Sequence, residues 1–137
     1  MPFKILAHAY RKPGMSTEDF KKHYEAHVGL IKRLSGDDFP LSHKRTYLTR
    51  QTVDVASAGA TSSNATTPAV VLVGQQSEFD FDAYAELTFT DEHACQVFVQ
   101  KIRAPEAVDQ IAADEELFLD RSKFAVVVLG DVSETTV

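Results

Sequence analysis

The clearest hydrophobic pattern lies between residues 16 and 34, where apolar side chains recur every three or four positions, as on one face of an amphipathic helix. The side chains on this face are Phe20, Tyr24, His27, Ile31 and Leu34. Ser16 is a favourable N-cap residue, and Lys32 and Arg33 place positive charge where it suits the helix dipole. The sequence therefore predicts a helix with a titratable imidazole, that of His27, on its buried face.

Alternation of side chains between two faces predicts three strands, at residues 2–10, 42–50 and 81–89, and an apolar run predicts a fourth at residues 122–132. The second strand is unusually polar, so we expect it at a sheet edge or facing a cavity. The last strand is apolar on both faces between residues 124 and 129, a pattern typical of a strand covered on both sides.

Two further helices are predicted after residue 90. Thr90 or Asp91 caps a helix that ends near Ile102, and Pro105 begins another. The apolar stripe of the second one would contain Val108, Ile111, Ala112 and Leu119, with Glu115 among them if the helix extends that far. The order of elements predicts an α+β, ferredoxin-like βαββαβ fold with an antiparallel four-stranded sheet, formed by a single domain over residues 1–137.

Helices would cover one face of this sheet, and the other face would carry His8, Tyr10, Tyr84 and Glu86. Because such a face should not stay in water, we expect a homodimer through it. Residues 51–68 are rich in small and polar side chains, which predicts a long loop that buries little and is more mobile than the strands. It would serve as a lid or as a passive connection. The apolar run 69–74 is long enough for a short extra strand.

Charge and composition narrow the classes of partner. The chain has 137 residues, and 14 basic against 20 acidic residues give a net charge of −6. No basic stripe is present, which argues against nucleic acid and anionic membranes as partners. Cys95 is the single cysteine, so neither an intramolecular disulfide nor a cysteine-based zinc site is expected. The first ten residues lack the pattern of a signal peptide, and we expect a cytoplasmic protein.

Segments spread along nearly the whole chain resemble one family. They are the residues 10–16 (YRKPGMS), Phe20 with residues 23–27 (HYEAH), the predicted strand 81–89 and residues 113–123 (ADEELFLDRSK). They are similar to the EthD-domain proteins of the dimeric α+β barrel superfamily, in particular the fungal branch. Many relatives follow the helix histidine with Ala-Pro or Gly-Pro, whereas Val28 and Gly29 follow it here.

The resemblance implies small dimers that hold ligands beside or within each sheet. Members include polyketide cyclases, cofactor-free monooxygenases, lactone isomerases and haem enzymes, and fungal relatives tailor aromatic polyketides by decarboxylation or dehydration. Three functions therefore stay open: a cofactor-free lyase or cyclase acting on a polyketide, a cofactor-free monooxygenase of anthrone-like substrates, and a ligand-binding dimer without catalysis.

The candidate catalytic residues are His27, as general acid/base, and Tyr24, as a hydrogen-bond donor to a carbonyl or phenol. A cleft for a flat ring would have small residues at its floor, namely Ala7, Ala9, Ala83 and Ala85, and apolar walls, namely Phe20, Phe81 and Phe89. The structural alternatives are a core histidine and close packing of helix on sheet. We expect no cofactor for this chemistry.

A second polar cluster, on the sheet face or its rim, would contain His8, His43, Arg45, Tyr47 and Glu86. Of these, His43, Arg45 and Tyr47 are candidates for substrate binding, and Arg45 could bind a carboxylate. The alternative is a solvated or interface ion pair. His23 and His27 are four residues apart, but His23 lies off the buried stripe, so we expect no metal centre.

Overall fold

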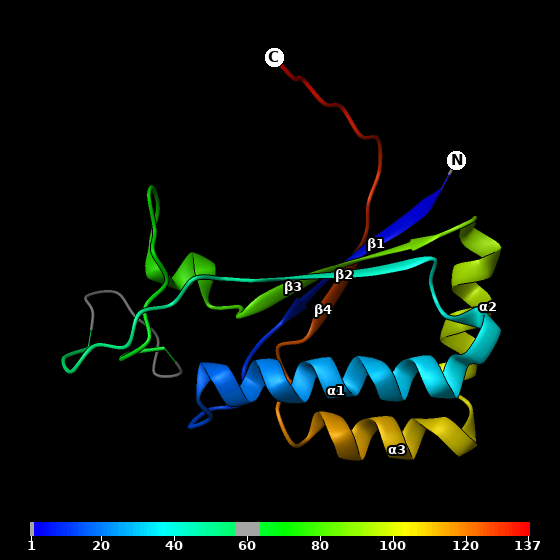
Figure 1. Ribbon diagram of the computed structural model, residues 1–137, viewed down its shortest axis with the longest axis horizontal. Helices are drawn as coiled ribbons and strands as arrows, with labels where there is room; N and C mark the ends of the chain where they lie inside the picture. The colour runs from blue at the N-terminus through cyan, green and yellow to red at the C-terminus, as the bar shows by residue number, and fades with distance from the viewer. Residues whose placement is uncertain (1, 57–63) are drawn as a thin grey trace.

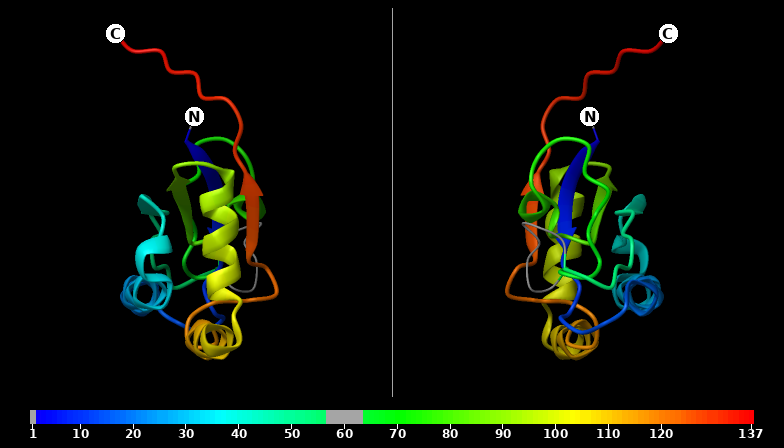
Figure 2. Two further views of the ribbon diagram at one scale, coloured as in Figure 1. Left: turned by 90° about the vertical axis from the view of Figure 1, so that its right-hand side faces the viewer. Right: turned by 90° about the vertical axis from the view of Figure 1, so that its left-hand side faces the viewer.

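The computed structural model describes residues 2–56 and 64–137. Its strands are β1 (Phe3–Ala9), β2 (Ser42–Tyr47), β3 (Ala83–Phe89) and β4 (Ala125–Val128), and its α-helices are α1 (Thr17–Ser35), α2 (Glu92–Ile102) and α3 (Pro105–Glu115). Two short 3-10 helices, η1 (Gly36–Asp38) and η2 (Gln76–Phe79), lie in the connections. The three α-helices lie on one side of the sheet (Figure 1). Figure 2 shows α1 and α3 end-on and next to one another, with α2 running across them.

The sheet has the strand order β2-β3-β1-β4, and each pair of neighbours is antiparallel. This confirms the predicted α+β ferredoxin-like fold and the place of β2 at an edge. Ala7 lies opposite Ala85 and Ala9 opposite Ala83, so four small side chains share the face that the helices cover. All four are buried, which lets the helices approach the sheet closely.

β4 lies at the opposite edge of the sheet, and it is shorter than the predicted strand 122–132. Val126, Val127 and Val128 are each more than half exposed. The expectation of cover on both sides is therefore wrong for the single chain. Its apolar residues therefore form an edge strand whose valines are uncovered in the single chain.

The helix boundaries agree with the capping residues in the sequence. The Ser16 side chain accepts a hydrogen bond from the backbone N–H of Asp19, and the Asp91 side chain accepts one from Ala94. The stripe predicted for α3 is wrong at Val108, which is 40% exposed, because the buried side chains are Ala107 and Ile111. These two are four residues apart, and the same face continues to Glu115 at the end of the helix.

A long connection between β2 and β3, here called the arm (residues 48–82), extends beyond one end of the sheet (Figure 1). Its two sides are paired near their base, by a bridge between Arg50 and Ala69 and a hydrogen bond from Gln51 N–H to the Pro68 carbonyl. Apart from this bridge, the run 69–74 forms no strand, because its side chains find no apolar partner surface and Leu72 is 93% exposed.

The arm is tied to the body by buried polar groups. Asp82 accepts a hydrogen bond from the Arg11 backbone N–H at 2.9 Å, and its other oxygen lies 2.7 Å from Arg50 Nε. Arg11 also donates to the Asn64 side-chain oxygen at 2.6 Å. Asn64 is only 3% exposed, so the expectation that residues 51–68 bury little is wrong at this position. Residues 57–63 lie outside the described residues. The predictions that residues 51–68 form a lid and are more mobile than the strands are not tested and stay predictions.

Candidate functional site

His27 and Tyr24 lie side by side on the buried face of α1, where the 3.6-residue period of the helix places them. Both line a cavity of about 290 Å³ between the helices and the sheet. Its walls are mainly aliphatic and aromatic side chains from β1, β3, β4 and all three helices. The polar side chains that reach it are those of Tyr24, His27, His43, Arg103 and Glu115. An apolar pocket with a few convergent polar groups is the usual form of a small-molecule site.

His27 is oriented by an acid from α3. Its Nδ1 lies 2.6 Å from Asp114 Oδ2, and its side chain is 7% exposed. Because an ionised carboxylate can only accept, Nδ1 carries the proton, and the neutral ring then has its lone pair on Nε2. Nε2 lies 4.0 Å from Glu115 Oε2, a group that lines the cavity. A histidine held this way by an acid has the orientation of a general base.

Glu115 brings a second acid to the cavity wall. Burial raises the pKa of its carboxyl, while His27 and Arg121 act in the opposite direction. Glu115 falls on the apolar stripe predicted for α3, but neither Glu115 nor Asp114 is among the site residues that the sequence predicts. The available signal was an acid at an apolar position of a helix, next to a second acid in the last turn.

Tyr24 supplies a neutral hydroxyl group. Burial raises the pKa of its phenol to about 12, the neighbouring acids add to this, and Arg45 opposes it. The Tyr24 ring packs on Phe20 and Phe118. Within the described residues its hydroxyl has no hydrogen-bond partner, so it is available to a ligand in the cavity.

The predicted second cluster does not exist as one group, since its members lie on opposite faces of the sheet. His43, Arg45 and Tyr47 lie opposite Leu87, Ala85 and Ala83, which places them on the face that the helices cover. His8 lies opposite Tyr84 on the other face, where Glu86 forms an ion pair with Lys4 at 3.2 Å. The strand register decides this split, and the sequence pattern of β2 alone does not reveal it.

Arg45 is occupied within the protein. Its guanidinium holds both oxygens of Glu25, at 2.6 and 2.9 Å, and the Tyr47 hydroxyl donates to the same carboxylate at 2.5 Å. The hydrogen bond from Arg45 lowers the pKa of Glu25 to about 2. Both outer nitrogens of Arg45 are engaged, one on His43 and the other on α1, which is the arrangement of the ion-pair alternative. Binding of a substrate carboxylate by Arg45 stays a prediction.

The structure brings Ala7 and His43 to the cavity beside His27 and Tyr24. Other predicted lining residues lie elsewhere, because helix and sheet pack closely: Ala9, Ala83, Ala85 and Phe89 are core residues, and Phe20 lies behind Tyr24. Phe81 is not a wall of this cavity. It precedes β3, where the chain turns Asp82 inward, and its ring stacks on His8 on the opposite face at 4.3 Å.

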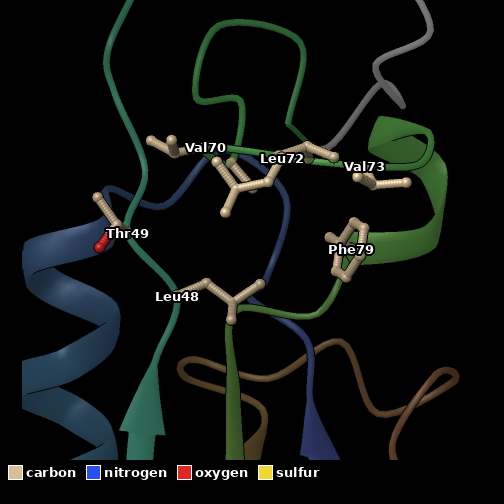
Figure 3. A pocket seen from close by; sticks show the side chains of 8 residues that line it. Leu48, Thr49, Val70, Leu72, Val73 and Phe79 are labelled. Atoms are coloured by element: carbon tan, nitrogen blue, oxygen red, sulfur yellow. The ribbon is translucent and has the colours of Figure 1, made fainter.

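A larger groove of about 670 Å³ lies between the arm and the end of the sheet. Figure 3 shows Leu48 and Phe79 on one side of it and Val70, Leu72 and Val73 on the other. Thr49 is the one polar side chain among its lining residues, so the groove offers apolar surface without acid/base groups.

Comparison with known proteins identifies the family. Residues 12–122 match the EthD domain. The chain belongs to the EthD domain family. Its fold is similar to that of an EthD family protein from Bacillus halodurans, with a TM-score of 0.56 and 17% sequence identity over 96% of this chain and 100% of the other. A search of curated protein sequences found no match.

Two plant proteins share the fold at a similar level. A protein from Arabidopsis thaliana has a TM-score of 0.54 and 16% identity, with 98% of this chain and 99% of the other covered. The hydroxynitrile lyase from Passiflora edulis has a TM-score of 0.51 and 16% identity, with 98% of this chain and 96% of the other covered. At such identities the likeness shows the fold alone. In the described part of the chain, no helix has the length and apolar character needed to cross a membrane.

Proposed function

We propose that this protein is a cofactor-free lyase or cyclase that decarboxylates or dehydrates a small aromatic molecule, with His27 as its general acid/base. The observation that carries the proposal is the Asp114–His27 pair, with His27 on the wall of a mainly apolar cavity. The Passiflora edulis relative is a lyase by name, which supports this reaction class at the level of the fold. The resemblance to fungal relatives supports an aromatic polyketide as the substrate class.

Dehydration of a β-hydroxy ketone illustrates the chemistry that these groups can perform. His27 Nε2 removes the proton from the carbon between carbonyl and alcohol, and Tyr24 donates a hydrogen bond to the carbonyl oxygen as it gains charge. The electron pair then returns from the enolate to form the new double bond and expels the hydroxyl group. The protonated His27 gives its proton to the leaving oxygen, so water departs and the imidazole is neutral again.

Decarboxylation of a β-keto acid needs the same two groups. The pair of electrons from the carbon–carboxylate bond enters the enolate, and carbon dioxide leaves. His27 Nε2 takes the proton of the carboxylic acid, Tyr24 stabilises the enolate oxygen, and His27 then delivers the same proton to carbon. The cavity volume of about 290 Å³ suits a molecule with one ring or with two fused rings, since pockets for drug-sized ligands begin at about this size.

The test is turnover of aromatic β-keto acids and β-hydroxy ketones, followed as release of carbon dioxide or as formation of the conjugated enone. Wild-type protein should turn over at least one of them, and His27→Gln should lose roughly 10²-fold or more, because the amide cannot titrate. His23→Ala, one turn earlier on α1 and away from the cavity, is the control. Unchanged activity of folded His27→Gln would refute the assignment.

The same cavity could serve a cofactor-free monooxygenase, which also needs a base next to an acidic phenol. Oxygen consumption during turnover would identify that reaction. Saturable binding of the same compounds without any product would instead favour a ligand-binding protein.

We also propose that the protein is a homodimer through the uncovered sheet face. His8, Tyr10, Phe81 and Tyr84 form an aromatic group on this face, with His8 stacked on Phe81 and Tyr84 edge-on to it. The exposed valines of β4 lie at the edge of the same sheet. Sedimentation at micromolar concentration should give twice the mass of the chain, and a stable monomer would rule the dimer out.

A further inference from the structure

His43 is held by a chain of polar groups that ends outside the cavity. Arg45 Nη1 lies 3.0 Å from His43 Nδ1 and also donates to the His43 carbonyl oxygen at 2.8 Å. Glu25 holds the same guanidinium through two hydrogen bonds, and the Tyr47 hydroxyl donates to Glu25. Here these three residues are called the relay (Glu25, Arg45, Tyr47).

The relay fixes the tautomer of His43. A guanidinium has donors only, so the Nδ1 atom that it contacts must present its lone pair. A neutral imidazole with a bare Nδ1 carries its proton on Nε2. The His43 ring lines the cavity, close to the edge of the Tyr24 ring, and within the described residues its Nε2 has no protein partner.

We propose that His43 is a substrate-positioning residue that presents its neutral Nε2–H to an oxygen atom of the substrate, and that the relay keeps it in this form. This rests on the proposed function and narrows it. Nε2 of His27 accepts a proton, whereas Nε2 of His43 donates one, so the cavity suits a compound whose carbonyl or enolate oxygen lies next to the C–H bond to be broken. Aromatic ketones and aldehydes with an acidic α-hydrogen have this chemistry.

The electrostatic surroundings of His43 keep the ring neutral. Burial and the positive charge of Arg45 lower the pKa of its imidazole to about 4, and His27 acts in the same direction. A backbone hydrogen bond at His43 and the charge of Glu25 oppose the shift without reversing it, and Glu25 is engaged by Arg45. Phe39 stacks on the other side of the His43 ring and brings no charge. The His43 ring therefore stays neutral across the neutral range of pH, and its Nε2–H group remains a hydrogen-bond donor.

The first test needs no substrate. Two-bond ¹H–¹⁵N correlation spectra of the histidine rings distinguish the two tautomers and the imidazolium. In wild-type protein, His43 should show the Nε2–H tautomer between pH 8 and 5. Arg45→Met should give a mixture of tautomers and an ordinary titration, whereas Lys44→Gln, on the other face of β2, should change neither. A proton on His43 Nδ1, or a charged His43 at pH 6, would overturn the proposal.

The second test compares two probes of one shape, 2-naphthol and naphthalene, because only the first has an oxygen atom. Wild-type protein should bind 2-naphthol more tightly, and His43→Ala should reduce this preference by about tenfold, the worth of one hydrogen bond. His43→Gln, which keeps an N–H donor, should restore part of it. Equal preference in wild type and His43→Ala would overturn the donor role. If His43→Ala does not fold, the histidine ring spectra of Arg45→Met test the donor role in its place.

The two proposals fail separately. If no compound is turned over but the naphthol preference depends on His43, the donor role stands and the lyase assignment falls. If turnover depends on His27 while the preference survives in His43→Ala, the lyase assignment stands and the role of His43 falls.

Discussion

Two clusters of ionisable residues are buried in this protein, and they differ in where their charged and polar groups find partners. At the base of the arm, Asp82 lies between Arg11 and Arg50, and Arg50 also donates to three backbone carbonyls. At the cavity, His43 uses Nδ1 on Arg45, and its Nε2 has no partner within the described residues. His27 uses Nδ1 on Asp114, and its Nε2 lies 4.0 Å from Glu115 on the cavity wall. A cluster whose donors end on backbone carbonyls holds segments together, whereas unpaired polar atoms in a cavity can act on a ligand.

The largest effect is expected at the base of the arm. Asp82→Asn removes the carboxylate that lies between the buried guanidinium groups of Arg11 and Arg50, and removing one partner of a buried pair costs about 3–5 kcal/mol. Urea unfolding measures the loss. Asp38→Asn is the control, since its pair with Lys101 is exposed and worth less than about 1 kcal/mol. Equal losses for the two variants would show that the arm cluster does not anchor the fold.

The next effect should separate activity from stability. In Asp114→Asn the amide can present its N–H to Nδ1 and so move the imidazole proton to Nε2, away from the tautomer that a base needs. Turnover should fall by roughly 10²-fold or more, while the melting temperature changes little because Asp114 is partly exposed. Asp109→Asn, exposed on the same helix, should leave both unchanged. A large loss of stability without loss of turnover would make the Asp114–His27 pair structural.

A smaller effect is expected in the dependence of stability on pH. The pKa of His43 is about 4 in the folded protein and near its ordinary value of 6.5 in the unfolded chain. Between pH 6.5 and 4 the unfolded chain therefore binds the extra proton, so the free energy of unfolding falls as the pH decreases through this window. In urea titrations, the stability of wild type relative to His43→Gln should be constant above pH 6.5 and should fall as the pH decreases from 6.5 to 4.

Two carboxyl groups near the site must be separated from His43. The raised pKa of Glu115 has the opposite sign, because its folded form binds the proton more tightly and acid relieves its burial. Glu25, with a pKa of about 2, loses its contribution only below pH 4.5. The difference between wild type and His43→Gln from pH 7 to 4.5 isolates the histidine, and parallel curves across this range would contradict the prediction.

The smallest effect is expected in the arm groove. Leu72 is 93% exposed, so Leu72→Ser should change the free energy of unfolding by no more than about 0.5 kcal/mol. Turnover should also stay the same, since the groove has no acid/base group among its lining residues. A fall in turnover for this variant would show that the larger groove, not the cavity under the sheet, binds the substrate.

Local patterns were sufficient for the fold and for the buried face of α1. The 3.6-residue period placed His27 and Tyr24 on one side of a helix, and alternation in β1 and β3 identified which residues face the helices. These features depend on neighbours within a few positions, which the sequence contains directly. The element order then restricted the topology to an antiparallel sheet with helices on one face.

Tertiary structure alone decided the partners of each polar group. Asp114 meets His27 across 87 positions, and Arg45 meets Glu25 across 20, so no local spacing could pair them. The register of β2 against β3 moved His43, Arg45 and Tyr47 to the helix side, and the turn at Asp82 moved Phe81 to the other face. A shift of one residue in the register of a strand moves every side chain to the opposite face of the sheet. A contact between two residues far apart in the sequence depends on the packing of all the elements between them. The sequence alone determined which residue carries the titratable group, and the fold decided what that group can do.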